Sequence, residues 1–279
     1  MVLNKAKFFL VCLGIASIKV FSQDSVNKFE LKGEIIQGGL IWGVASNVSE
    51  IYLGNTKIKT DSAGHFIFGF DRDDTDKQSL KIIYKDNQID FKVLTPVKRS
   101  YNIQRINELE QKYVSPPKEL LEKIEKETKI IAEARLLIDN TDTAYYLSGF
   151  MRPVEGGRIS GVFGGQRILN GEAKSPHNGI DIALPAGTPV YAMADGVVRL
   201  KGDDFHYNGN FILLDHGLGL SSVYVHLLKT FVSTGEKVTK GQKIGEVGST
   251  GRSTGPHLHW GVQWYKKRID PQAVLDLEK

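Results

Sequence analysis

The sequence predicts a mainly β protein: a small immunoglobulin-like β-sandwich at residues 23–105, a helical linker at 106–149 and a C-terminal antiparallel β domain at 150–279. Its length of 279 residues suggests two domains, or one large domain with an appendage. The 29 glycines against 9 prolines favour many tight turns, which usually accompany β structure. A hydrophobic fraction of 41% and a charged fraction of 24% exclude a largely disordered or collagen-like chain.

Residues 1–22 have the three parts of a secretory signal peptide. A basic start precedes an apolar stretch at residues 8–20, and Val20 and Ser22 stand at positions −3 and −1 of a cleavage site before Gln23. The stretch is short for a membrane span, so we expect export and cleavage rather than a retained membrane anchor. No stable membrane insertion is expected after cleavage.

The only cysteine, Cys12, lies within this signal, so the exported chain would have no disulfide and no thiolate ligand. Any metal would then be held by histidine and carboxylate. Export without disulfides predicts a bacterial envelope protein. Because residues 1–22 contain three lysines and no acid, their removal lowers the formal charge from +4 to +1, which argues against nucleic acid as a partner.

Residues 27–105 alternate short apolar runs with turn residues. Segments 50–53 and 56–60, for example, flank a Gly-Asn turn and indicate a hairpin. About 75 residues of such strands suit a small β-sandwich. We expect its one histidine, His65, to be an ordinary strand residue.

Residues 115–138 change to a helical pattern. Ser115 followed by two prolines is typical of a helix start. Apolar residues then recur at steps of three and four, with lysine and glutamate between them. We expect an amphipathic connecting helix packed on one domain.

Residues 150–279 are glycine-rich and hold six of the seven histidines. The clearest strands are expected at 209–217, 221–228, 243–248 and 257–265. Candidate chemistry therefore concentrates in this domain.

Two patterns place possible ligands at strands. His177 and Asp181 stand four residues apart where a loop enters a strand, and a histidine and a carboxylate in that arrangement can converge on one cation. His257 and His259 share one face of a strand, because residues i and i+2 point the same way. Two adjacent imidazoles on a polar face are costly unless they bind something.

A third strand carries His226. Val223 and Val225 are expected on its core face, with Tyr224 and His226 on the opposite, non-core face. Each pattern is weak alone, but three of them in one cysteine-free domain are much stronger. Two histidines and one aspartate make a catalytic zinc site with an open position for water, and two further histidines remain to handle protons.

With these motifs in view, the chain resembles the lysostaphin- or LytM-type zinc endopeptidases, which cut peptide bonds in bacterial peptidoglycan. The resemblance covers roughly residues 150–271 and rests on an HxxxD motif, a YxHL-like strand and GxSTGPHLH. The matching segments are 157–172, 177–198, 212–227, 238–262 and 268–271. The preceding region, 27–149, is more loosely similar to that of exported Gram-negative members.

The resemblance implies a Zn²⁺ ion held by His177, Asp181 and His259. It implies a catalytic pair in His226 and His257, one for acid–base work and the other for the oxyanion. Some relatives that have lost ligands only activate other wall hydrolases, but this chain keeps every ligand.

We therefore expect an exported zinc metalloendopeptidase that hydrolyses cross-link or stem peptide bonds of peptidoglycan. A zinc-bound water would be the nucleophile, and the periplasm or envelope of a Gram-negative-type bacterium would be its location. Alternatives are a non-catalytic wall-binding or amidase-activating module, or a secreted peptidase that acts on proteins.

The sequence also supports predictions for two further histidines and one loop. His206, in a polar loop, and His216, in a turn, are expected not to be ligands. The loop at residues 167–172 is expected to form a wall of the substrate groove. Alternatively, Asn170 or Glu172 supplies an oxygen to the metal and holds the enzyme latent.

Overall fold

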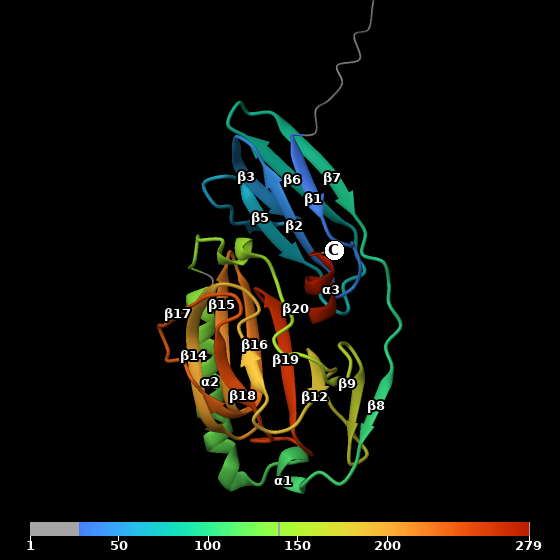
Figure 1. Ribbon diagram of the computed structural model, residues 1–279. Coiled ribbons are helices and arrows are strands. Elements are labelled where there is room, and N and C mark those ends of the chain that lie inside the picture. The colour runs from blue at the N-terminus through green and yellow to red at the C-terminus, as the bar shows by residue number, and fades with distance from the viewer. Residues whose placement is uncertain (1–27, 139, 279) are drawn as a thin grey trace, which may run out of the picture.

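The computed structural model describes residues 28–138 and 140–278, and the expected signal at residues 1–22 lies outside them. The described chain is mainly β, as the sequence predicts. Figure 1 shows an N-terminal group of strands stacked on a larger C-terminal sheet, with an extended segment descending along one side. Within the described residues, no helix is long and apolar enough to cross a membrane.

The N-terminal strands form two small sheets that share one core. The first has the order β1-β2-β5 and the second β4-β3-β6-β7. Their inward side chains, such as Phe66 and Phe68, are fully buried. The strands are β1 (Phe29–Lys32), β2 (Leu40–Ala45), β3 (Val48–Leu53), β4 (Thr56–Ile58), β5 (His65–Gly69), β6 (Gln78–Tyr84) and β7 (Ile89–Leu94).

The chain leaves this sandwich through a strand that joins the other domain. Strand β8 (Ile103–Ile106) pairs in parallel with β10 (Gln166–Leu169), which also pairs with β11 (Glu172–Ala173). The end of the N-terminal region therefore lies beside the loop that precedes the first candidate ligand, as Figure 1 shows near β9.

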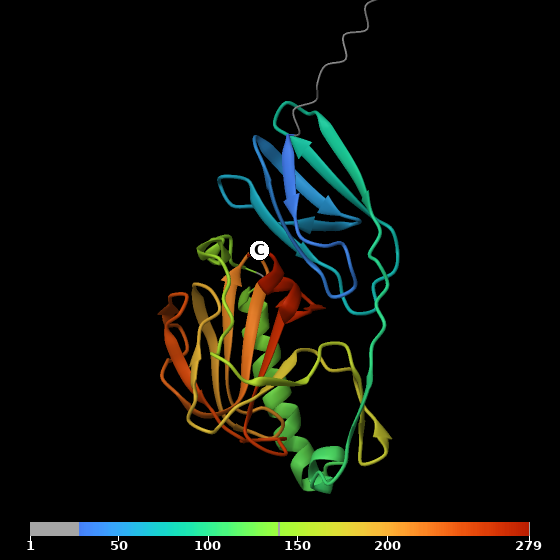
Figure 2. The same cartoon turned by 45° about the vertical axis from the view of Figure 1, so that its right-hand side comes forward.

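Two helices follow, α1 (Gln111–Val114) and α2 (Lys118–Ile138). Helix α2 begins directly after the two prolines and buries Ala134 and Ile138. These residues pack with Phe211, Leu213 and Val225 in a second, smaller hydrophobic cluster. The helix therefore covers one face of the C-terminal sheet, along which Figure 2 shows it running.

The C-terminal domain is built on a ten-stranded sheet with the main order β17-β14-β15-β16-β19-β12-β9. Every pairing in it is antiparallel. Its elements are β9 (Arg158–Gly161), β12 (Ile180–Ala183), β13 (Pro189–Tyr191), β14 (Gly196–Phe205), β15 (Gly209–Gly217), β16 (Leu220–Thr230), β17 (Lys237–Val238), β18 (Lys243–Val247), β19 (His257–Trp264) and β20 (Lys267–Ile269), with the short helices η1 (Tyr145–Ser148) and α3 (Pro271–Asp276).

The register of the three central strands decides which residues share a face. Asp181 on β12 and Val225 on β16 both pair with His259 on β19, so all three lie on the face toward α2. Tyr224 pairs with Trp260, and both are fully buried in the main core on the opposite face. Both faces are thus covered near these strands, and Asp181 and His259 on the α2 face are only 6% and 9% exposed.

Polar contacts join the two domains. The Arg99 side chain pairs with Asp270 at 2.8 Å, and Arg72 Nε donates to the Gly164 carbonyl at 2.6 Å. The backbone N–H of Arg268 donates to Asp71 Oδ2 at 2.8 Å. The hydrophobic core is also continuous between the sandwich and the C-terminal sheet.

Candidate metal centre and active site

The three expected ligands meet at one point on the α2 face of the sheet. His177 Nε2 lies 3.0 Å from Asp181 Oδ1, His259 Nδ1 lies 2.8 Å from the same oxygen, and the two nitrogens are 2.9 Å apart. His177 comes from the loop before β12, Asp181 from β12 and His259 from β19. The antiparallel pairing of Asp181 with His259 creates this convergence from segments 78 residues apart.

The neighbouring backbone fixes the orientation of these side chains. His177 Nδ1 lies 2.9 Å from the Val162 carbonyl, to which it donates, so Nε2 carries the free lone pair. Gly161 on β9 lies against the carboxylate: a Cβ at this position would sit 2.4 Å from Asp181 Oδ2. A glycine here therefore lets β9 approach the site.

The electrostatics favour a neutral His259 imidazole and an ionised Asp181 carboxylate. Burial lowers the pKa of His259 to about 4, although Asp181 opposes this shift. Burial by itself would raise the pKa of Asp181, but its contacts with the His177 and His259 imidazoles hold it well below its usual range.

The donor set fits a divalent transition metal. The three buried ligand atoms, from His177, Asp181 and His259, lie close enough together for one ion to contact all of them. The free lone pair of His177 points at a carboxylate oxygen and at a second imidazole, an arrangement that a cation between them would stabilise. Two imidazoles and one carboxylate are ligands that suit zinc and leave a coordination position open.

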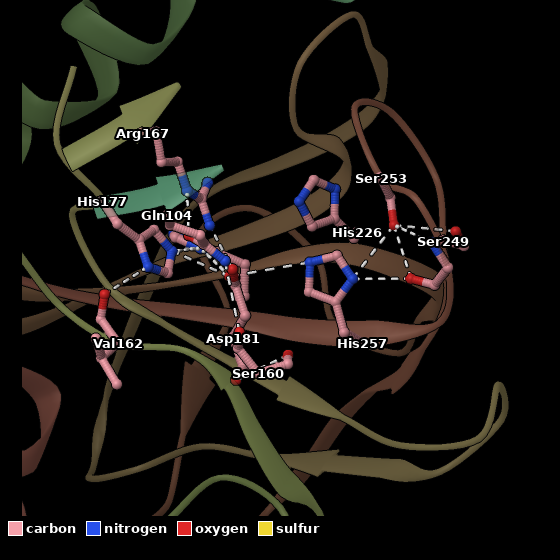
Figure 3. A network of polar contacts seen from close by, with 12 residues as sticks. Gln104, Ser160, Val162, Arg167, His177, Asp181, His226, Ser249, Ser253 and His257 are labelled. Carbon is pink, nitrogen blue, oxygen red and sulfur yellow. Dashed lines mark hydrogen bonds and ion pairs between the residues drawn. The ribbon is translucent and has the colours of Figure 1, made fainter. Parts of the chain in front are cut away.

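Arg167 and Gln104 support the carboxylate, and the sequence alone did not single them out. The Arg167 guanidinium pairs with Asp181 Oδ2, the oxygen that faces away from His177 and His259. Its Nε donates to Gln104 Oε1 at 3.1 Å. Figure 3 shows Arg167 reaching toward Asp181 from beside Gln104. Gln104 belongs to β8, so a residue from the N-terminal side of the helical linker reaches the site.

His226 and His257 form a second pair next to the first three residues. Their ring centroids are 4.8 Å apart, and Figure 3 shows the two rings facing one another. His226 Nδ1 donates to the Thr250 carbonyl at 2.8 Å, and His257 Nδ1 to the Gly255 carbonyl at 2.8 Å. Each hydrogen bond leaves Nε2 unprotonated, and Nε2 of His257 lies 3.9 Å from Asp181 Oδ1.

The expected orientation of the strand that carries His226 is wrong. Tyr224 is a fully buried core residue, and Val223 and Val225 pack instead in the cluster beneath α2. His226 has a φ of 65°, and the pairing register of β16 shifts at this position. This β-bulge interrupts the alternation and turns His226 toward His257 and His259.

The other histidines lie elsewhere. His216 is part of β15 rather than a turn, and it is fully buried between the Asp195 carbonyl and the Ser222 hydroxyl. His206 contacts the Lys112 carbonyl at 3.1 Å and the ring of Tyr113. His65 lies on β5 and pairs with Asp61. None of the three belongs to the convergent group found among the described residues.

Asn170 and Glu172 do not face the ligands. The Asn170 amide bonds to the backbone N–H and carbonyl of Leu109, and Glu172 accepts from Ser115 and pairs with Lys174. Both side chains therefore secure the start of the helical linker, and the alternative in which they supply an oxygen to the metal is wrong for this conformation.

A cavity of about 350 Å³ adjoins the centre on the side of β8. Its walls come from β8, β10 and residues 252–257, and Asp181, His226 and His257 line it. Arg167 and Leu169 line it too, so part of the 167–172 loop is a groove wall as expected. The arrangement gives an extended ligand access to the candidate metal ligands and to both paired histidines.

The fold and the site together define a candidate hydrolytic metal centre on an antiparallel sheet. Residues 175–271 match the family described as peptidase family M23, and the chain carries a domain of this metallopeptidase family.

Two proteins of Vibrio cholerae are among its relatives. The chain is 46% identical over 104 residues to "Peptidoglycan DD-endopeptidase ShyA", a match that covers 37% of this chain and 24% of the relative. It is 40% identical over 134 residues to "Peptidoglycan DD-endopeptidase ShyC", covering 45% and 30% respectively. The matched region thus spans less than a third of either relative.

A solved structure resembles more of the chain. A Pseudomonas aeruginosa protein assigned to peptidase M23 superimposes with a TM-score of 0.62 at 26% identity, covering 87% of this chain and 95% of that one. The likeness therefore includes much of the region before the M23 match as well as the C-terminal sheet.

Proposed function

We propose that the protein is an exported zinc endopeptidase that hydrolyses peptide bonds of bacterial peptidoglycan. The observation that carries the proposal is the convergence of His177, Asp181 and His259 beside an open cavity, with His226 and His257 next to them. The M23 match and the names of the two Vibrio relatives support peptidoglycan peptides as substrate. The signal pattern at residues 1–22 supports export to the periplasm or envelope of a Gram-negative-type bacterium.

His177, Asp181 and His259 would hold the zinc ion. When bound, zinc supplies Lewis-acid activation of water and of the scissile carbonyl. Asp181 contributes one oxygen to this centre, while Arg167 binds the other and keeps the carboxylate oriented.

His226 and His257 would manage the protons. In each, Nδ1 is committed to a backbone carbonyl, so Nε2 is free to accept a proton from the attacking water. Once protonated, the same Nε2 can donate to the developing oxyanion or to the leaving amine. Because Nε2 of His257 lies 3.9 Å from the ligand oxygen of Asp181, we assign the first proton transfer to His257.

Digestion of purified peptidoglycan by the zinc-loaded protein tests this function. We expect mass spectrometry of the soluble fragments to show new amino and carboxyl ends at one kind of peptide bond. A chelator or the Asp181→Ala variant should abolish their formation. Zinc-loaded protein that binds the wall without releasing fragments would support a non-catalytic module. Cleavage of proteins but not of wall peptides would indicate a secreted peptidase of other specificity.

A further inference from the structure

A second cavity, of about 250 Å³, lies on the opposite side of the centre, between α2 and the sheet. His226, Arg167 and Arg252 line both cavities, so the two are neighbours across the site. His259 also lines the second cavity, which places its interior next to a candidate metal ligand. A peptide that crosses the centre from the first cavity would enter the second.

The polar lining of this second cavity is strongly cationic. Four arginines contribute to it, namely Arg135 from α2, Arg167 from β10, Arg252 from the loop before β19 and Arg268 from β20, and no aspartate or glutamate does. Arg167 is neutralised by Asp181, and Arg252 lies over the ring of Tyr207 with its guanidinium 4.6 Å from the ring centroid. Arg135 and Arg268 have neither of these two kinds of contact with any residue that the structure describes.

Arg135 and Arg268 line this cavity, and within residues 28–138 and 140–278 neither guanidinium forms an ion pair with a carboxylate. Burial lowers the pKa of Arg268, and the Asp71 carboxylate, which accepts from the backbone N–H of Arg268 at 2.8 Å, offsets only part of that shift. Burial, and then the charge of Arg268, lowers the pKa of Arg135 to about 10. Two partly buried like charges repel each other, so an anion between them would be stabilising.

The remaining walls are apolar, with Ile131 on α2 facing Phe211, Leu213, Val223 and Val225 of the sheet. A carboxylate at the end of a short carbon chain fits this combination, because the chain would contact the apolar wall while the guanidinium groups bind the acid. Arginine is suited to this role through its planar set of donors.

We propose that Arg135 and Arg268 bind a free carboxylate of the peptide substrate on the α2 side of the metal centre. The proposal rests on the proposed endopeptidase function and adds its substrate class, an acidic peptide. It also gives helix α2 a part in substrate recognition in addition to its packing role.

The test uses a cross-linked peptide dimer released from purified peptidoglycan and the same dimer with its carboxylates converted to carboxamides. Arg135→Gln and Arg268→Gln should each raise KM for the acidic dimer by about 10- to 100-fold, with little change in kcat. KM for the amidated dimer should stay nearly constant. Lys126→Gln is the matched control, because it removes the same charge from an exposed position on α2.

A second arm separates this proposal from the endopeptidase function. Zinc-loaded His257→Ala protein, with and without Arg135→Gln, is titrated with both dimers by calorimetry. The site would be supported if the acidic dimer binds more tightly than the amidated dimer and if Arg135→Gln abolishes this difference. That result would hold even if the wild type cleaves neither dimer. Equal effects on the acidic and amidated dimers, or no effect of either arginine substitution in folded protein, would overturn it.

Discussion

Each domain contains a histidine and an aspartate four residues apart, and the two pairs differ in what surrounds them. In the sandwich, His65 Nδ1 lies 2.8 Å from Asp61, and their side chains are 26% and 18% exposed. In the C-terminal domain, His177 lies 3.0 Å from Asp181, with exposures of 1% and 9%. The two pairs have the same sequence spacing and similar nitrogen–oxygen distances, but only the pair His177 and Asp181 is deeply buried.

A third ligand separates the pairs further. Asp61 accepts from the backbone N–H groups of Ala63 and His65, so its pair closes a turn. Asp181 instead meets His259 from a neighbouring strand and Arg167 from beyond the sheet. A histidine and an aspartate at this spacing therefore do not define a metal site by themselves. Burial and a donor from a distant strand are what distinguish the pair to which we assign the metal.

The largest expected effect comes from removing a donor in each region. Asp181→Ala or His259→Ala should abolish bound zinc and wall hydrolysis, because two remaining donors hold the ion poorly and an open catalytic site needs three. Asp61→Ala and His65→Ala should keep one zinc per chain and near-normal activity. Elemental analysis of purified variants, together with a wall-solubilisation assay, checks both. Full zinc in Asp181→Ala protein would contradict the assignment.

Substituting a histidine beside the metal centre should lower kcat without removing the ion, whereas substituting a ligand should remove the ion. His226→Ala and His257→Ala should retain zinc yet lose about 10²- to 10⁴-fold in kcat, the usual contribution of acid–base groups. His206→Ala, which lies outside the site, is the control. A variant of either residue with near-normal turnover would remove that residue from the catalytic pair.

A smaller effect, on zinc affinity, is expected from Arg167 and from Gln104, which β8 brings next to the metal centre. Arg167→Gln should weaken zinc affinity by about 10- to 100-fold, because it frees the second oxygen of Asp181. Gln104→Ala should have a weaker effect in the same direction, since it contacts Arg167 only. Competition with a chromogenic chelator measures both. Unchanged affinity in Arg167→Gln would show that the ion pair does not orient the ligand.

The smallest expected effect concerns stability and pH at a buried histidine outside the centre. Burial lowers the pKa of His216 below its ordinary value. The unfolded chain therefore binds this proton more readily, and the native state loses stability as pH falls below about 6.5. His216→Gln should show a shallower fall in unfolding free energy between about pH 7.5 and 5.5, measured in urea. An identical slope in wild type and variant would show that His216 does not contribute.

The sequence predicted most strands and the set of residues that meet at the site because both follow from local patterns. A short apolar run marks β15, alternation marks β19, and the HxH spacing puts His257 and His259 on one side of a strand. The resemblance implied that Asp181 and His259 hold the same ion, but the pairing of β12 with β19 was not predicted, since register is a tertiary property.

Other features of the site were beyond local reasoning. Alternation put His226 and Tyr224 on the same non-core face, but the bulge with its positive φ at His226 separates them, so that Tyr224 enters the core while His226 faces the site. Gln104 and Arg167 meet through a parallel pairing of β8 and β10, which lie about 60 residues apart in the sequence. Arg135 follows a helical pattern that gives no sign of a cavity beneath it.

Anomalous X-ray diffraction at the zinc absorption edge tests the central claim most directly. We expect a single zinc peak per chain, bound by Nε2 of His177, Oδ1 of Asp181 and Nδ1 of His259, with His226 and His257 outside bonding distance. A peak bound by His226 or His257, or one at the His65–Asp61 pair, would contradict it.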